Sequence, residues 1–321
     1  MVRAAIPQVS PHEFHSLNER FYHLAPYEYL DARMQSLILT VSDDAQEELG
    51  MLLARGVSYK NLRTTGEPSE RTALDRYAAI ESTVLLHHAS EALLRLYLAH
   101  AHRTPCPWLA LSSILSPAEF KTSVRELRDE LDKPERVDDL VEVFSFTSDR
   151  SNFEDVSEEI WLSHRAGLVR LVRHLIDEVL EGAHAYNAAK HGLALGAGDL
   201  GLQLAADGEE PLFDHKGPAL NYLELSGRSD DRHWRVTSTF INPPRNIAVV
   251  FLVLGQIKSL WTVAKTMRHI ERSESETFHP LSLASIEEVL DGDQKTGFSP
   301  KGFSERLHSP DAHQVPSNLW P

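Results

Sequence analysis

Apolar residues recur at the 3.6-residue period of an α-helix along two long stretches of the chain. From about Ser69 to His102 the apolar positions fall on every side of the helix, which is typical of a helix in the middle of a bundle. From about Asp155 to His191 they form one stripe, with charged residues on the opposite face. The pattern therefore predicts two long helices.

Shorter segments with the same helical period are predicted at 26–39, 42–56, 116–131 and 134–144. In the second of these, Ser42 is the expected N-cap, and Gly56 is the expected end of the helix. These shorter helices would pack around the two long ones.

Past Gly192 the pattern changes to the alternation of apolar and polar residues that marks β-strands. Strands are predicted at 200–206, 219–226 and 233–241, and residues 227–232 would join the last two as a hairpin. A last long helix begins at Pro243 and Pro244, and its predicted buried face consists of Ile257, Leu260, Trp261, Ala264 and Met267. The predicted fold class is mainly α: a helical bundle with a small three-stranded antiparallel β insert before the last long helix.

The pattern also predicts a division of the chain into three segments. Residues 1–64 form an N-terminal helical arm, and residues 65–270 form the bundle with its β insert at about 200–241. Residues 271–321 form a loosely ordered C-terminal tail, because serine, proline, glycine and charged residues dilute its apolar content. One short helix is expected in this tail, near 285–290.

Composition narrows the class of protein. Hydrophobic residues make up 42% of the chain, and the one cysteine, Cys106, excludes an internal disulfide framework and suits a reducing compartment. The first residues lack the apolar run of a secretory signal, and the most apolar stretch, 247–255, is too short to cross a bilayer. We therefore expect a cytoplasmic protein without a membrane partner.

The net charge of −15 argues against electrostatic binding of nucleic acid over the whole surface of the protein. The acidity is concentrated between Pro117 and Glu159, where 14 acidic residues stand against 6 basic ones. This segment is either a solvated helical face or a surface that repels nucleic acid everywhere except at one local site.

Residues 196–201, GAGDLG, match the G-x-G-x-x-G fingerprint of dinucleotide-binding proteins. That motif requires a strand before the glycines and a helix after them, so that the helix N-terminus meets the pyrophosphate. Here a helix precedes the glycines and a strand follows them. We therefore predict a flexible helix-to-strand turn and no dinucleotide site.

Residues 184–193, HAYNAAKHGL, bring chemically active side chains together at the end of the second long helix. Lysine and histidine in a last turn followed by glycine are also an ordinary helix stop, so a structural and a functional interpretation both remain open. On a helical wheel Tyr186 and Lys190 fall inside the apolar stripe, where a lysine needs a carboxylate partner unless it reaches solvent. Glu81 and His88 of the first long helix are the candidates to face this cluster.

Glu91 lies near the same edge of the first long helix and is spaced to pair with Arg95. Together, Glu81, His88 and Glu91 are predicted to support a polar cleft shared with the end of the later helix.

The pairing of ESTVLLHHASEALLRLYLAHA, at 81–101, with a later helix that ends in YNAAKHG, at 186–192, resembles the HEPN superfamily. The resemblance implies a compact helical bundle and a metal-independent ribonuclease of a toxin–antitoxin or defence system, with a site usually composed across a homodimer. The motif it resembles is Arg-Asn-x-x-x-His. Asn187 and His191 match this motif, and Tyr186 stands in place of the arginine.

The chemistry of these residues fits cleavage of RNA through its 2′-hydroxyl. His191 can move a proton near neutral pH, and Lys190 can place positive charge beside the developing phosphorane. Asn187 can orient the histidine or the phosphate, and Tyr186 can stack on a base. No cofactor is expected.

Two other interpretations stay open. A metal site would draw on His87, His88 and Glu91 of one helix and His184 and His191 of the other, but the His-Glu-x-x-His pattern is absent, so we predict no metal. The alternative function is a non-catalytic helical scaffold that forms a dimer or binds a basic protein partner through the acidic segment 119–159.

Overall fold

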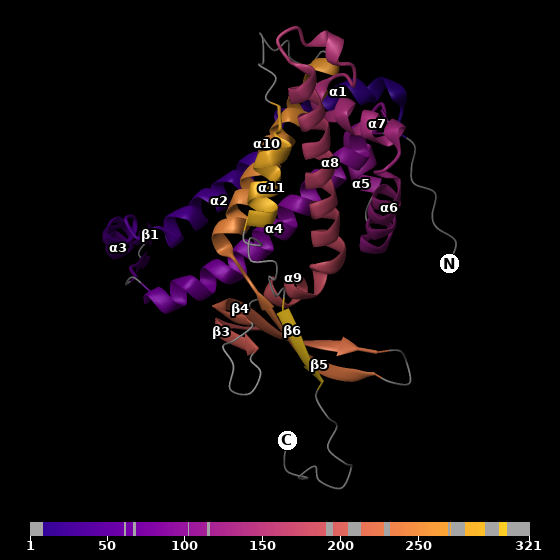
Figure 1. Cartoon of the computed structure of the whole chain (residues 1–321). Helices are drawn as coiled ribbons and strands as arrows, with labels where there is room; N and C mark the ends of the chain where they lie inside the picture. The colour runs from indigo at the N-terminus through magenta and orange to yellow at the C-terminus, as the bar shows by residue number, and fades with distance from the viewer. Residues whose placement is uncertain are drawn as a thin grey trace. The chain divides into compact units, whose positions relative to one another are not determined.

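The computed structural model describes residues 9–60, 62–66, 69–101, 103–113, 116–190, 195–204, 213–227, 232–268, 270, 280–292 and 302–306. Within them the chain is mainly α, with an antiparallel sheet before the last long helix, which confirms the predicted fold class (Figure 1). Contacts divide the chain into two compact units: 1–34, 85–182 and 248–292 in the first, and 35–84, 183–247 and 293–321 in the second. The segments predicted from the sequence, 1–64, 65–270 and 271–321, are continuous along the chain, whereas each compact unit combines separate parts of it. The three-segment division therefore stays a prediction.

Three helices run through both units: α2 (Pro26–Val41), α4 (Arg71–Ala101) and α10 (Pro243–Met267). The first unit also contains α1 (Phe14–His23), α5 (Pro107–Ser113), α6 (Pro117–Glu130), α7 (Pro134–Ser145), α8 (Glu158–Glu181) and α11 (Leu283–Asp291). The second contains α3 (Gln46–Arg55), β1 (Val57–Tyr59), β2 (Leu62–Thr64), α9 (Ala183–Ala189), β3 (Leu195–Leu204), β4 (Phe213–Ser226), β5 (His233–Phe240) and β6 (Gly302–Arg306).

In the first unit, α8 contacts α6, α7 and α11. Its predicted apolar stripe is buried, including Leu168, Leu171 and Leu175. Side-chain caps begin two of these helices as the sequence leads one to expect: Ser116 accepts from the Glu119 amide of α6, and Ser157 accepts from the Ile160 amide of α8. Local hydrogen bonding and apolar spacing thus define the helices that form this core.

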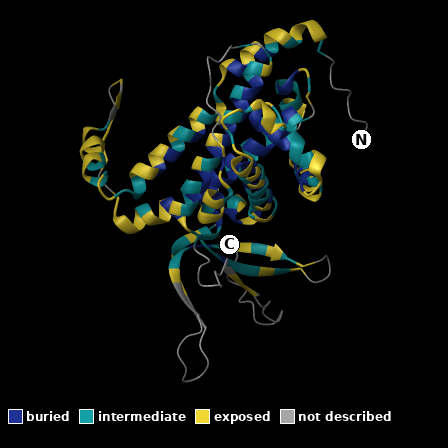
Figure 2. Ribbon diagram, turned by 45° about the horizontal axis from the view of Figure 1, so that its top comes forward, coloured by how far each residue is buried: buried dark blue, intermediate teal, exposed yellow. Residues whose placement is uncertain are grey.

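In the second unit, β3, β4, β5 and β6 form one antiparallel sheet in that order. Leu220 pairs with Thr239, and Thr237 pairs with Ser304. The sequence pattern did not predict the fourth strand, β6. Figure 2 shows buried residues mainly in the helices, whereas most described positions on the strands are half-buried or exposed.

Three local predictions were wrong. Ser42 is not the N-cap of α3, which begins at Gln46 after Ala45, although Gly56 does end the helix, with a φ of +66°. The glycines of 196–201 lie inside β3 and do not form a turn; because they are within a strand, no helix N-terminus follows them. Met267 is 57% exposed, whereas the other four residues of the predicted buried face of α10 are buried.

The α10 helix is long and apolar enough, by length and composition alone, to cross a membrane, and 56% of its most apolar window is buried. The buried core helix of a globular protein passes the same test.

Candidate functional site

The predicted second long helix is interrupted at Gly182, and this break defines the candidate site. The α8 helix ends at Glu181, and α9 begins at Ala183. A Cβ at position 182 would lie 2.6 Å from the Glu178 carbonyl oxygen, so the close approach requires glycine. A helical wheel drawn straight through this point therefore misplaces the residues beyond it.

The α9 helix packs one face against the sheet. Ala185 and Ala188 are buried against Tyr222 of β4, with Leu195 of β3 packed alongside. Small alanine side chains allow the helix to lie close to the strands. Asn187 and Lys190 are on the exposed side, and Tyr186 is half-buried. The helical wheel was wrong to place Lys190 inside the apolar stripe, and the lysine reaches solvent, which is one of the two alternatives that the sequence left open.

Three of the predicted site residues are brought together at the C-terminal end of α9: Tyr186 and Asn187 lie in the helix, and Lys190 directly follows it. Lys190 Nζ donates a hydrogen bond of 2.9 Å to Asn187 Oδ1 and lies 5.6 Å from the centroid of the Tyr186 ring. The second distance is within the range of a cation–π interaction. With its oxygen engaged by the ammonium, the Asn187 amide still carries two N–H donors. This Tyr186–Asn187–Lys190 cluster therefore presents a fixed cation and an amide group beside an aromatic ring.

His191, the predicted acid–base residue, lies outside the described residues. His184, at the start of α9, is 63% exposed, and its Nε2 lies 3.8 Å from Glu224 Oε1 of β4. The same carboxylate group accepts a hydrogen bond of 3.2 Å from Thr237 of β5. These contacts tie the N-terminal end of α9 to the sheet, opposite the end that carries the cluster.

The predicted supporting residues make other contacts. Arg95 Nε donates to Glu91 Oε1 at 2.7 Å, which confirms the predicted pair. His88 Nδ1 lies 2.8 Å from Arg33 Nη1 of α2. Glu81 is half-buried on α4. Within the described part of the chain, the Lys190 ammonium contacts Asn187 and Tyr186 of the preceding helical turn. His88 and Glu91 belong to the first compact unit and α9 to the second, so their supporting role stays a prediction.

Sequence reasoning missed the histidine of α4 that meets α8. His87 is buried, and its Nδ1 lies 3.7 Å from Glu178 Oε1. His87 and His88 are adjacent in a helix with apolar residues on every side, so apolar spacing does not decide which ring faces which neighbour. Among the described residues, no group of three histidine, cysteine or carboxylate side chains is placed to hold a metal ion.

The carboxylates of the acidic segment 119–159 make many intramolecular ion pairs. Their partners include the following: Glu130 with Arg136 and Lys133, Asp132 with Arg173, Asp138 with Arg165, and Glu142 with Arg103. Hydrogen bonds from Arg136 and Lys133 lower the pKa of the Glu130 carboxyl. Part of the negative charge of this segment is therefore neutralised within the molecule, and the docking of a basic protein partner on it stays a prediction.

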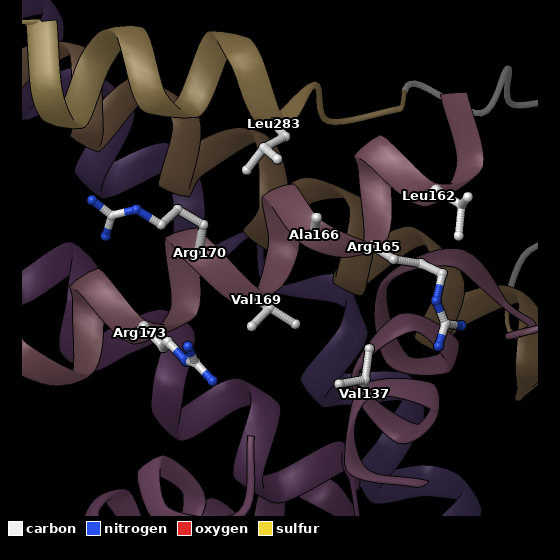
Figure 3. Close-up of a pocket in the computed structure, with 8 residues that line it drawn as sticks. All are labelled: Val137, Leu162, Arg165, Ala166, Val169, Arg170, Arg173 and Leu283. Carbon is white, nitrogen blue, oxygen red and sulfur yellow. The ribbon is translucent and has the colours of Figure 1, made fainter. Parts of the chain in front are cut away.

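A shallow groove of about 410 Å³ in the first unit is the other candidate (Figure 3). Arg165, Arg170 and Arg173 of α8 stand around Val169 in the centre of the groove. Arg165 pairs with Asp138 at 2.6 Å, Arg170 with Asp291 at 2.8 Å, and Arg173 with Asp132. Because each guanidinium already has a carboxylate partner, the groove has little positive charge to offer an anion.

No family model matches the chain, and no curated protein and no solved structure is significantly similar to it. The resemblance to the HEPN superfamily consequently rests on the quoted residues of the two long helical segments and on the chemistry of the α9 cluster.

Proposed function

We propose that this chain is an HEPN-like protein that binds single-stranded RNA at the C-terminal end of α9 and cleaves it without a metal ion. The observation that carries the proposal is the exposed Lys190 ammonium, fixed by Asn187 beside the Tyr186 ring. RNA-binding sites for single strands combine a cation for the phosphate with an aromatic face for a base.

In this proposal each residue has one role. Lys190 and the N–H2 group of Asn187 contact the non-bridging oxygens of one phosphate, and Tyr186 stacks on an adjacent base. His191, which occupies the histidine position of the motif, removes the proton of the 2′-hydroxyl as that oxygen attacks phosphorus. The bond to the 5′-oxygen breaks, that oxygen takes up a proton, and a 2′,3′-cyclic phosphate remains.

The test uses a labelled single-stranded RNA in EDTA, with binding and cleavage measured for the full chain. We expect Lys190→Ala to weaken binding roughly tenfold, which corresponds to the loss of about one charge-assisted contact. His191→Ala should retain binding and lose cleavage. Tyr186→Ala should weaken binding by a similar factor to Lys190→Ala, because base stacking contributes roughly 1–3 kcal/mol.

Lys258→Ala is the matched control. Lys258 Nζ also lies over a tyrosine ring, at 5.3 Å from the centroid of Tyr27, but it has Asp31 4.0 Å away in place of an asparagine. This variant should bind and cleave as the wild type does. A wild-type chain that binds no RNA at low salt would contradict the whole proposal and favour the non-catalytic scaffold. Binding without cleavage would support the proposed RNA-binding site and contradict the proposed ribonuclease activity.

A further inference from the structure

The α3 helix has an unusual place in the second unit, because none of its ten residues is buried. Met51 is 56% exposed and Leu52 is 53% exposed. A helix of this length is marginal in water unless an apolar face is packed against a partner. The exposed residues therefore indicate a surface that is covered when the protein is assembled.

One side of α3 is attached to the rest of its unit. The Gly66 amide donates to the Leu53 carbonyl at 3.1 Å, and the Gln46 side chain donates to the Thr40 carbonyl at 2.8 Å. Gln46, Leu49 and Gly50 are half-buried on this side. At 100° per residue, Glu48, Met51, Leu52 and Arg55 share the opposite side, and all four are exposed.

The order of these four residues is self-complementary. In an antiparallel pair of identical helices centred between positions 51 and 52, Met51 of one helix faces Leu52 of the other. Glu48 of each helix then faces Arg55 of the other, so that two opposite-charge pairs flank an apolar centre. Glu47 and Glu48 lie at the start of the helix and Arg55 at its end, which also places acidic side chains beside the other helix's C-terminal arginine.

We infer that a second copy of this chain docks on α3 through this antiparallel, two-fold contact. An isologous interface of this kind repeats each contact twice. Ten residues span only about 15 Å, and a stable interface buries about 800 Å² on each partner. The same unit exposes further apolar side chains, Ile38 and Leu39 of α2, which are 41% and 55% exposed.

The test is the molar mass of the full chain by sedimentation equilibrium at concentrations up to about 100 µM. We expect a dimer for the wild type and a monomer for Met51→Lys, since a lysine at the apolar centre would face a leucine and its own symmetry mate. Met267→Lys is the matched control, because Met267 is 57% exposed on α10 and lies outside the proposed surface; this variant should remain a dimer.

Charge reversal tests the antiparallel register. Glu48→Arg and Arg55→Glu should each raise the dimer dissociation constant at least tenfold, because each places like charges opposite one another twice. The double variant Glu48→Arg with Arg55→Glu should recover the wild-type value within about threefold. Circular dichroism of every variant checks that α-helical content is unchanged. A monomeric wild type, or a double variant as weak as the single ones, would overturn the inference.

Discussion

At the scale of single residues, two buried histidines link distant parts of the first unit. Tyr22 Oη donates to His100 Nε2 at 2.7 Å, and the His100 Nδ1–H donates to the Leu96 carbonyl at 2.7 Å. The Leu281 amide donates to His164 Nδ1 at 2.9 Å, and His164 Nε2–H donates to Ser145 Oγ at 2.9 Å. Both rings are hydrogen-bonded as neutral imidazoles.

Burial lowers the pKa of His100 and of His164 from the ordinary value of 6.5 to about 4. As the pH falls below about 6.5, these two histidines become protonated in the unfolded chain but stay neutral in the native state. We therefore expect the free energy of unfolding to decrease between about pH 6.5 and pH 4, by up to about 3 kcal/mol for each ring. Urea unfolding at a series of pH values measures this decrease.

Histidine-to-glutamine variants separate the contribution of these two rings to the pH dependence from the contribution of the other titratable groups. His100→Gln should remove about half of the pH dependence over that window, since one of the two rings no longer titrates. His23→Gln is the control, because His23 is exposed at the end of α1, and we expect it to change the slope much less than His100→Gln does. An equal effect of both substitutions would contradict the assignment to buried rings.

At the scale of elements, the packing of α11 on α8 depends on one glycine. A Cβ at Gly167 would lie 3.0 Å from the Leu281 carbonyl oxygen and 3.3 Å from the Leu283 amide nitrogen. The segment before α11 is also held by Ser163, whose Oγ accepts from the Leu283 amide at 3.0 Å. Because these neighbours are backbone atoms of residues 281–283, they cannot move aside as a flexible side chain would to accommodate a methyl group.

We predict opposite signs for two glycine-to-alanine substitutions in long helices. Gly167→Ala should lower the free energy of unfolding, because overpacking costs roughly 1–3 kcal/mol and the gain in helix propensity is about 1 kcal/mol. Gly255→Ala in α10 should raise it by roughly 0.5–1 kcal/mol, since its Cβ would meet no atom within 4 Å. Thermal unfolding of both variants measures this difference. A higher free energy of unfolding in both would contradict the close contact between Gly167 and the segment before α11.

The same elements explain which features the sequence could predict. Helices α4, α6 and α10 depend on local spacing and on serine or proline at their starts, so their limits were predicted to within a few residues. Strand β6 depends on pairing with β5, more than sixty residues earlier, and a five-residue segment has too short a pattern to show this.

The candidate site was predictable in its membership and not in its geometry. Lys190 is three residues after Asn187 and four after Tyr186, and residues at these two spacings are neighbours along a helical turn. The break at Gly182 depends on backbone contact with Glu178, which hydrophobic spacing does not reveal. Beyond this break Lys190 is exposed, and its partner is the Asn187 amide in place of a carboxylate.

At the scale of the whole molecule, the charge distribution determines how RNA would be bound. The net charge is −15, and the acidic segment pairs many of its carboxylates with arginines of the same unit. These arginines are then unavailable to phosphates as well. RNA binding at the α9 cluster would therefore depend on very few cations and would lack a broad positive field around them.

The small number of cations at the α9 cluster predicts a weak dependence of RNA affinity on salt concentration. Each phosphate neutralised on a single strand contributes a slope of about −0.7 to the plot of log affinity against log salt concentration. Lys190 alone predicts a slope near −0.7, and a contribution from one more cation predicts about −1.4. Lys190→Ala should shift the slope towards zero by about 0.7, whereas Lys258→Ala should leave it unchanged. Fluorescence anisotropy over a salt series measures both. A slope steeper than about −3 would mean that several cations spread over the surface hold the RNA, and that α9 is not the principal site.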